Sequence, residues 1–142
     1  MYTKECLRMW PPAVGILARV AKEDITMGPY KITKGSFVGT NIIGGCHNPK
    51  YWKNPDVFDP DRWLEKDQLS EQPYAYIPFS AGPRSCIGKG LALMEAKIIL
   101  IYFLKHFTLK RTEVPLRLTA KFLYEPVEGD LVKLNPKPEN SW

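Results

Sequence analysis

Proline constrains this chain more than any other residue type, because 13 of its 142 residues are proline. Proline has a fixed φ and no amide donor, so it ends helices and is excluded from the interior of a sheet. Five of these prolines lie from Cys46 to Pro78, in a stretch that is also rich in Asn, Asp and aromatic residues. We therefore expect a long coil here, with short helical turns near Asn48–Trp52 and Asp59–Trp63, and few long helices elsewhere.

The remaining composition is that of a globular chain. Apolar residues make up 44% of it, which is enough to bury a core and excludes intrinsic disorder and collagen-like repeats. We expect residues 1–142 to belong to one domain. The net charge is +5, but the basic residues are scattered and form no nucleic-acid-binding motif, so no nucleic acid is expected as a partner.

The sequence predicts neither a membrane span nor an N-terminal leader peptide. The opening residues, MYTKECLRMWPP, contain no apolar core and no cleavage site of small residues. The longest apolar run, Ile98 to Leu104, has seven residues, whereas a helix that crosses a bilayer needs about 20. We expect no membrane segment in this chain.

The number and spacing of the cysteines argue against disulfide bonds and against a structural zinc site. Cys6, Cys46 and Cys86 are odd in number and contain no CxxC pair, which disfavours both a disulfide-stapled domain and a structural zinc site. At least one thiol should therefore be free. Cys6 and Cys46 are expected to be small buried residues.

The N-terminal part should hold one short helix and a small β meander. Residues 1–9 are typical of the end of a helix, which Pro11 and Pro12 stop. A helix this short is marginal alone and must be stabilised by packing. The β-prone run Ala13–Val20 precedes turn residues and short apolar runs, so we expect a meander over Ala13–Val20, Ile25, Tyr30–Ile32 and Phe37–Val38.

The clearest predicted element is a long helix from Gly88 to His106, where apolar residues recur at steps of three and four. Beyond it we expect three short strands and a turn at Glu128–Asp130, followed by a loose tail from Asn135. The expected strands are Leu116–Leu118, Phe122–Tyr124 and Leu131–Leu134. Together these elements predict an α+β chain.

One stretch is much more specific than the rest. The residues from Phe79 to Gly88, FSAGPRSCIG, place Cys86 in a glycine-containing loop directly before the long helix. Unpaired backbone amides and the positive end of the helix dipole stabilise an anion there, which favours a thiolate suited to be a metal ligand or a nucleophile. Gly82 and Gly88 would let a flat partner approach the backbone closely. Nucleophilic catalysis is disfavoured, because neither histidine of the chain has a recognisable relation to Cys86.

This stretch resembles the haem-binding signature of the cytochrome P450 family, Phe-x-x-Gly-x-Arg-x-Cys-x-Gly, at every fixed position. Four other landmarks follow the family's order: Glu5-Cys-Leu-Arg8 ahead of the double proline, Phe58-Asp-Pro60-Asp-Arg62-Trp63, Ala92 with Glu95, and Asp130-Leu-Val-Lys-Leu134. The resemblance implies that residues 1–142 are the C-terminal part of a single domain of the mainly α cytochrome P450 fold, with the N-terminal part absent.

The resemblance also implies a cofactor, haem b (iron protoporphyrin IX), and roles for the loop. Cys86 would be the axial thiolate ligand of the haem iron, and Arg84 would pair with a haem propionate. Phe79 would pack beside the sulfur and exclude water. Further cofactor-binding positions implied in this way are Gly82, Gly88, Ala92 and Arg19, although a solvated strand arginine is an equal alternative for Arg19. No catalytic residue beyond the haem ligand is implied in this segment.

A structural cluster is implied upstream of the loop. Glu5 and Arg8 lie three residues apart, so they share a helix face and can pair, either as an ordinary surface pair or as part of a buried site. In the family, the arginine that matches Arg62 joins them in a buried Glu-Arg-Arg cluster that holds the cysteine loop. The residue after Arg62 is Trp63, where the family's pattern has phenylalanine.

For a full-length protein, the resemblance implies a haem-thiolate monooxygenase. Such an enzyme inserts one oxygen atom from O2 into a small apolar substrate, with electrons from a redox partner such as NADPH-cytochrome P450 reductase. It would be associated with a membrane, the endoplasmic reticulum if the source is eukaryotic. The alternative is a truncated, non-catalytic remnant that folds partly and does not bind haem productively.

Overall fold

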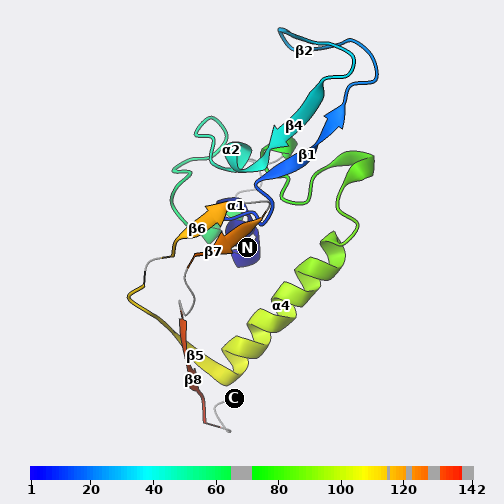
Figure 1. Cartoon of the computed structure of the whole chain (residues 1–142). Helices are drawn as coiled ribbons and strands as arrows, with labels where there is room; N and C mark the ends of the chain where they lie inside the picture. The colour runs from blue at the N-terminus through cyan, green and yellow to red at the C-terminus, as the bar shows by residue number, and fades with distance from the viewer. Residues whose placement is uncertain (65–71, 115, 121–122, 128–131, 139–142) are drawn as a thin grey trace.

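The computed structural model of the chain describes residues 1–64, 72–114, 116–120, 123–127 and 132–138. Figure 1 shows a long helix (α4), short helices (α1 and α2) and pairs of short strands, joined by extended coil. The α-helices of the described part are α1 (Tyr2–Met9), α2 (Ile42–Cys46) and α4 (Lys89–His106), and its 3-10 helices are η1 (Pro60–Trp63), η2 (Pro73–Ala75) and η3 (Gly82–Arg84). The strands are β1 (Gly15–Val20), β2 (Ile25–Met27), β3 (Tyr30–Ile32), β4 (Phe37–Asn41), β5 (Phe107–Arg111), β6 (Leu118–Ala120), β7 (Tyr124–Pro126) and β8 (Val132–Pro136).

The expected N-terminal meander is wrong in its pairing. Strand β2 pairs with β3 in a tight hairpin, in which Gly28 has a φ of +57° that suits glycine in a turn. Strand β1 instead pairs with β4, with Gly15 opposite Asn41 and Val20 opposite Phe37. Because the local hairpin uses both β2 and β3, it extends as a separate arm beyond β1 and β4 (Figure 1).

Helix α2 was not expected from the sequence. It begins after Asn41, whose side-chain oxygen accepts a hydrogen bond from the amide of Gly44 at 2.9 Å. This N-cap stabilises a short helix that contains two glycines, which are poor helix formers. Of the two helical turns expected in the coil, Asp59–Trp63 is confirmed as η1, whereas Asn48–Trp52 forms hydrogen-bonded turns and no helix.

The two predicted helices are confirmed. Helix α1 ends at Met9, ahead of Pro11 and Pro12, and α4 begins directly after Gly88. No residue of α4 is buried, although most of the helix is apolar. Among the described residues, no helix is both long and apolar enough to cross a membrane.

The C-terminal strands differ from the expected ones. Strand β5 follows α4 without a break and was missed, and it pairs along its whole length with β8, from Phe107 opposite Pro136 to Arg111 opposite Val132. The expected loose tail is wrong at its start, because Asn135 and Pro136 belong to β8 and the amide of Lys137 donates to the carbonyl of His106 at 2.8 Å. Strands β6 and β7 begin two residues later than expected. The expected turn Glu128–Asp130, Phe122 and Leu131 lie outside the described residues.

The buried part of the described structure is small and, apart from Ala21 beyond the end of β1, lies around α1. Its apolar members come from α1, α2, η2 and the coil: Met9, Ala21, Ile42, Cys46, Trp52 and Ala75. Its charged members are Glu5, Arg8 and Arg62. Charged residues are rarely buried unless they are paired, so this core points to an ordered electrostatic cluster.

Candidate functional site

Three charged side chains from two distant elements meet in the core. In α1, Arg8 donates from Nη2 to Oε1 of Glu5 at 2.8 Å and from Nε to Oε2 at 3.1 Å, a forked geometry that suits a guanidinium and a carboxylate. From η1, Arg62 donates from Nε to Oε1 of Glu5 at 3.1 Å. Glu5 and Arg8 are 0% exposed and Arg62 is 7% exposed. The sequence-predicted cluster residues are therefore brought together in one buried site.

The cluster also orders the coil. The remaining guanidinium donors of Arg8 and Arg62 are bound by backbone carbonyl oxygens, so neither buried charge is left without partners. These carbonyls belong to Cys46, Lys53, Asn54, Pro55 and Val57, at 2.7 to 3.3 Å. Hydrogen bonds from the two guanidiniums thus satisfy carbonyl groups of this part of the proline-rich stretch, which lacks the backbone hydrogen bonds of a helix or sheet.

The environment of Glu5 keeps its carboxylate ionised. Burial by itself raises the pKa of Glu5, but hydrogen bonds from Arg8, the amide of Asp59 and the indole of Trp63 outweigh it. The result is a pKa lowered from 4.5 to about 2. The carboxylate is therefore charged at every physiological pH, which suits a permanent structural anchor.

The cysteine loop closes on itself at the start of α4. The amide of Cys86 donates to the carbonyl of Phe79 at 2.9 Å, and the amide of Ser85 donates to the carbonyl of Gly82 at 3.0 Å. Gly82 has a φ of +74°, which glycine adopts without strain. A Cβ atom added at Gly88 would lie 3.8 Å from the sulfur of Cys86. The loop thus holds the thiol near the helix N-terminus, and both Cys86 and Arg84 are exposed.

A largely apolar cavity of about 320 Å³ lies over the loop. Four of the sequence-predicted residues line it, namely Arg19, Phe79, Arg84 and Cys86. The other lining residues are Pro12, Ala13, Gly15, Ile16, Ile42, Pro78, Ser80 and Leu123. Leu123 reaches this place through an isolated antiparallel bridge to Ala13. Gly82, Gly88 and Ala92 do not line the cavity, so only the first four predicted residues meet there.

The two arginines share one side of this site. Arg19 of β1 and Arg84 of η3 both line an adjoining hollow of about 370 Å³, together with the segment from Ser80 to Pro83. Two guanidiniums beside an apolar cavity suit a flat ligand with acidic substituents. Among the described residues, no group of three His, Cys, Asp or Glu side chains gathers to hold a metal. The thiol, the apolar walls and the arginines fit a flat prosthetic group that carries its own metal.

The other two cysteines do not share this setting. Cys46 is fully buried, and burial raises the pKa of its thiol to about 11. Burial also raises the pKa of Cys6, which is partly exposed. Of the three thiols, Cys86 is the exposed one, and it alone lines the cavity over the loop.

Three aromatic residues that the sequence reasoning did not assign to the site border the cluster. The rings of Trp63 and Tyr76 are 4.7 Å apart, and Trp52 lies 5.6 Å from Trp63 and 6.4 Å from Tyr76. The Trp63 indole also donates to Oε2 of Glu5 at 2.9 Å. The sequence signals for this role are the aromatic residues that recur along the proline-rich coil and, for Trp63, the tryptophan in place of the family's phenylalanine after Arg62.

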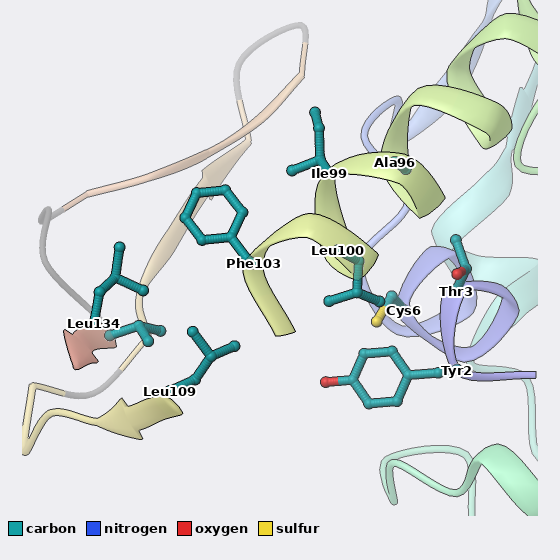
Figure 2. Close-up of a pocket in the computed structure, with 10 residues that line it drawn as sticks. Tyr2, Thr3, Cys6, Ala96, Ile99, Leu100, Phe103, Leu109 and Leu134 are labelled. Atoms are coloured by element: carbon teal, nitrogen blue, oxygen red, sulfur yellow. The ribbon is translucent and has the colours of Figure 1, made fainter. Parts of the chain in front are cut away.

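An apolar groove lies away from the cysteine loop and shares no lining residue with the cavity over that loop. Figure 2 shows this apolar groove of about 520 Å³, with Tyr2, Thr3 and Cys6 on the α1 side and Leu100 and Phe103 on the α4 side. The remaining lining residues are Ala96, Ile99, Leu109, Val132 and Leu134. Its lining carries no charged side chain, which distinguishes it from the site around Cys86.

Known sequences resemble this chain over almost its whole length. Residues 1–132 match the family model described as Cytochrome P450. Cytochrome P450 3A13 of Mus musculus is 39% identical over 142 residues, a match that covers 98% of this chain and 28% of the relative. Thromboxane-A synthase of Sus scrofa is 36% identical over 140 residues, covering 96% of this chain and 26% of the relative. The chain thus spans about a quarter of the length of these two relatives.

Solved structures also resemble the fold of this chain. The crystal structure of the cytochrome P450DA heme domain superposes with a TM-score of 0.84 and 34% sequence identity, covering 95% of this chain and 30% of that one. A mutant of the same heme domain superposes with a TM-score of 0.84 and 33% identity, covering 95% of this chain and 31% of that one. The arrangement of strands, coil and α4 described above is therefore that of a segment of such a domain.

Proposed function

Because this chain belongs to the cytochrome P450 family, we propose that it provides the haem-binding, thiolate-ligating part of a monooxygenase. The observation that carries the proposal is the single cavity lined by Cys86, Phe79, Arg84 and Arg19. A thiol, apolar walls and two guanidiniums are the complement of an iron porphyrin, which has a metal centre, a flat apolar ring and two propionates.

Cys86 is the proposed axial ligand. The bond from its amide to the carbonyl of Phe79 fixes the loop, so the thiol is directed into the cavity before any ligand arrives. Such preorganisation lowers the entropy lost on binding. When bound, haem supplies the activation of O2 and the insertion of one oxygen atom into an apolar substrate, and thiolate ligation favours cleavage of the O–O bond.

The neighbouring side chains have positioning roles in this proposal. Arg84 and Arg19 would bind the propionates through charge-assisted hydrogen bonds and so set the rotation of the ring. Phe79, which lines the cavity beside Cys86, would keep water from the sulfur and thereby tune the reduction potential. The open backbone at Gly88 leaves room beside the sulfur that a larger side chain would narrow.

The buried cluster of Glu5, Arg8 and Arg62 would hold the coil that leads toward the loop. It makes no contact with the cavity, so its part in haem binding is structural. The parent enzyme's partners follow from the family: a small apolar substrate, O2 and a redox partner such as NADPH-cytochrome P450 reductase. Its proposed location is a membrane, that of the endoplasmic reticulum in a eukaryotic source.

The test is the absorption spectrum of the chain reconstituted with haem, reduced and exposed to carbon monoxide. We expect the red-shifted Soret band of thiolate ligation in the wild type and its loss in Cys86→Ser. Cys6→Ser is the matched control, because it removes a thiol outside the cavity and should leave the band in place. A band that persists in Cys86→Ser would overturn the ligand assignment. A wild-type chain that takes up no haem would instead favour the non-catalytic remnant.

A further inference from the structure

Trp63 occupies a position where the residue type matters chemically. Its indole Nε1 donates to Oε2 of Glu5 at 2.9 Å, and Glu5 is completely buried. A hydrogen bond to a buried carboxylate is stronger than one between neutral groups. Phenylalanine would keep one aromatic ring there, but it would lack the donor and fill less space. The tryptophan therefore adds to the cluster a bond that the arginines do not make.

Glu5 uses all of its acceptor capacity. Oε1 accepts from Arg8, from Arg62 and from the amide of Asp59 at 3.0 Å, whereas Oε2 accepts from Arg8 and Trp63. Three other charged or titratable groups lie beside this environment. Lys4 lies with its Nζ 5.4 Å from the Trp63 ring centroid. Burial raises the pKa of Cys6 and of Tyr76, and the charge of Glu5 raises both further, so both stay protonated. Removing the Trp63 donor would leave Oε2 with a single partner, so the ionised form would lose stability relative to the protonated one.

The ring of Trp63 contacts a second part of the molecule. It lies edge-on to Tyr76 with ring centroids 4.7 Å apart, and Tyr76 is part of the segment that leads to Phe79. The carbonyl of Phe79 accepts the amide of Cys86. Trp63 is thus the one aromatic residue of the trio that both donates to the Glu5 carboxylate and packs edge-on against the segment entering the loop.

We propose that Trp63 is a positioning residue of the cysteine site, joining the Glu5 cluster to the Tyr76 segment that enters the Cys86 loop. Its N–H holds the carboxylate and its ring holds the tyrosine. The part of this inference that concerns haem rests on the proposed function, whereas the bond to Glu5 can be tested without haem.

Trp52 provides a matched control. It lies in the same aromatic group and also donates through its indole, but to the neutral carbonyl of Gly45 at 3.0 Å. Trp63→Phe and Trp52→Phe therefore make the same chemical change at two positions of one aromatic group, and Trp52 is the more buried of the two. We expect the midpoint of acid unfolding of the full 142-residue chain, followed by far-UV circular dichroism, to rise by about one pH unit in Trp63→Phe. Trp52→Phe should leave this midpoint near the wild-type value.

Equal acid midpoints in the two variants would overturn the proposal, because the role of Trp63 would then be packing alone. If Trp63→Phe is unfolded at neutral pH, the indole N–H resonances of the wild-type chain are followed by NMR as the pH is lowered. The resonance of Trp63 should shift as Glu5 takes up a proton, and that of Trp52 should not. An unmoved Trp63 resonance, or a wild-type chain without a cooperative acid transition, would contradict the inference.

On the haem-loaded protein, faster haem loss in Trp63→Phe than in Trp52→Phe supports the link to the loop. Absence of haem uptake by the wild type would count against the proposed function alone.

Discussion

The Nε atom of Arg62 lies 3.1 Å from Oε1 of Glu5, although the two residues are 57 positions apart in the chain. This bond joins α1 to η1, and strands β1 to β4 and the first part of the proline-rich coil lie between these two elements in the chain. Both groups are buried, so either one alone would be a charge without its counterpart. The order of this part of the molecule therefore depends on both partners being present.

Breaking the cluster should unfold the chain or prevent haem uptake. We expect Glu5→Ala or Arg8→Ala to lower the free energy of unfolding by about 3–5 kcal/mol, because each leaves a buried charge without its partner. Urea unfolding followed by circular dichroism measures this change. Glu23→Ala, on the exposed turn before β2, should change it by less than about 0.5 kcal/mol. A Glu5→Ala chain with wild-type stability and a normal haem spectrum would refute the role of the cluster.

Stability should fall in acid in a defined range. The pKa of Glu5 is about 2 in the folded chain against an ordinary value of 4.5. Because the folded pKa is depressed, the stabilisation is complete above about pH 4.5 and is lost as the pH falls towards 2, a total of about 3 kcal/mol. Unfolding free energies measured from pH 7 to pH 3 test this, with Glu23→Gln as the control. A flat profile between pH 5 and 3 would show that the carboxylate is not held as described.

The three thiols should differ in reactivity. In the folded chain at pH 8, we expect iodoacetamide to modify Cys86 first, Cys6 slowly and Cys46 not at all. Cys46 is buried with its pKa raised to about 11, whereas Cys86 is exposed. Peptide mass spectrometry over time gives the order. Haem should protect Cys86 and leave the rate at Cys6 unchanged; equal protection of both would indicate general tightening of the fold instead of ligation.

Replacement of Arg84 should separate haem binding from stability. Arg84 is exposed beside the cavity, so Arg84→Ala should leave the urea midpoint of the haem-free chain unchanged. Loss of one charge-assisted hydrogen bond should weaken haem affinity roughly ten- to hundredfold. Haem transfer to an acceptor protein measures the affinity, with Arg111→Ala in β5 as a control for charge. Identical transfer rates in both variants would remove Arg84 from the site.

Local signals predicted part of this structure well. The prolines after α1, the glycine before α4 and the apolar periodicity of α4 are properties of neighbouring residues, and both helices lie where they were expected. The loop around Cys86 was found for the same reason, since its signature is contiguous. The spacing of Glu5 and Arg8 indicated a pair, but only the family resemblance indicated the contact with Arg62.

Long-range pairings were not predictable in this way. Strand β5 continues directly from α4 and forms a strand by pairing with β8, which lies beyond β6 and β7 in the chain. Likewise β1 pairs with β4 only because β2 and β3 satisfy each other. The bond from Trp63 to Glu5 depends on the direction of an indole N–H, which no sequence pattern encodes.

The bare surface of α4 has a practical consequence. This helix presents Leu91, Met94, Ile98, Ile101 and Tyr102 to solvent, each more than half exposed, on several of its sides. An apolar area of this kind binds any complementary surface it meets, including another copy of itself. The state of the purified chain should consequently vary with its concentration, and dilution series are needed before any spectrum or unfolding curve is assigned to a single molecule.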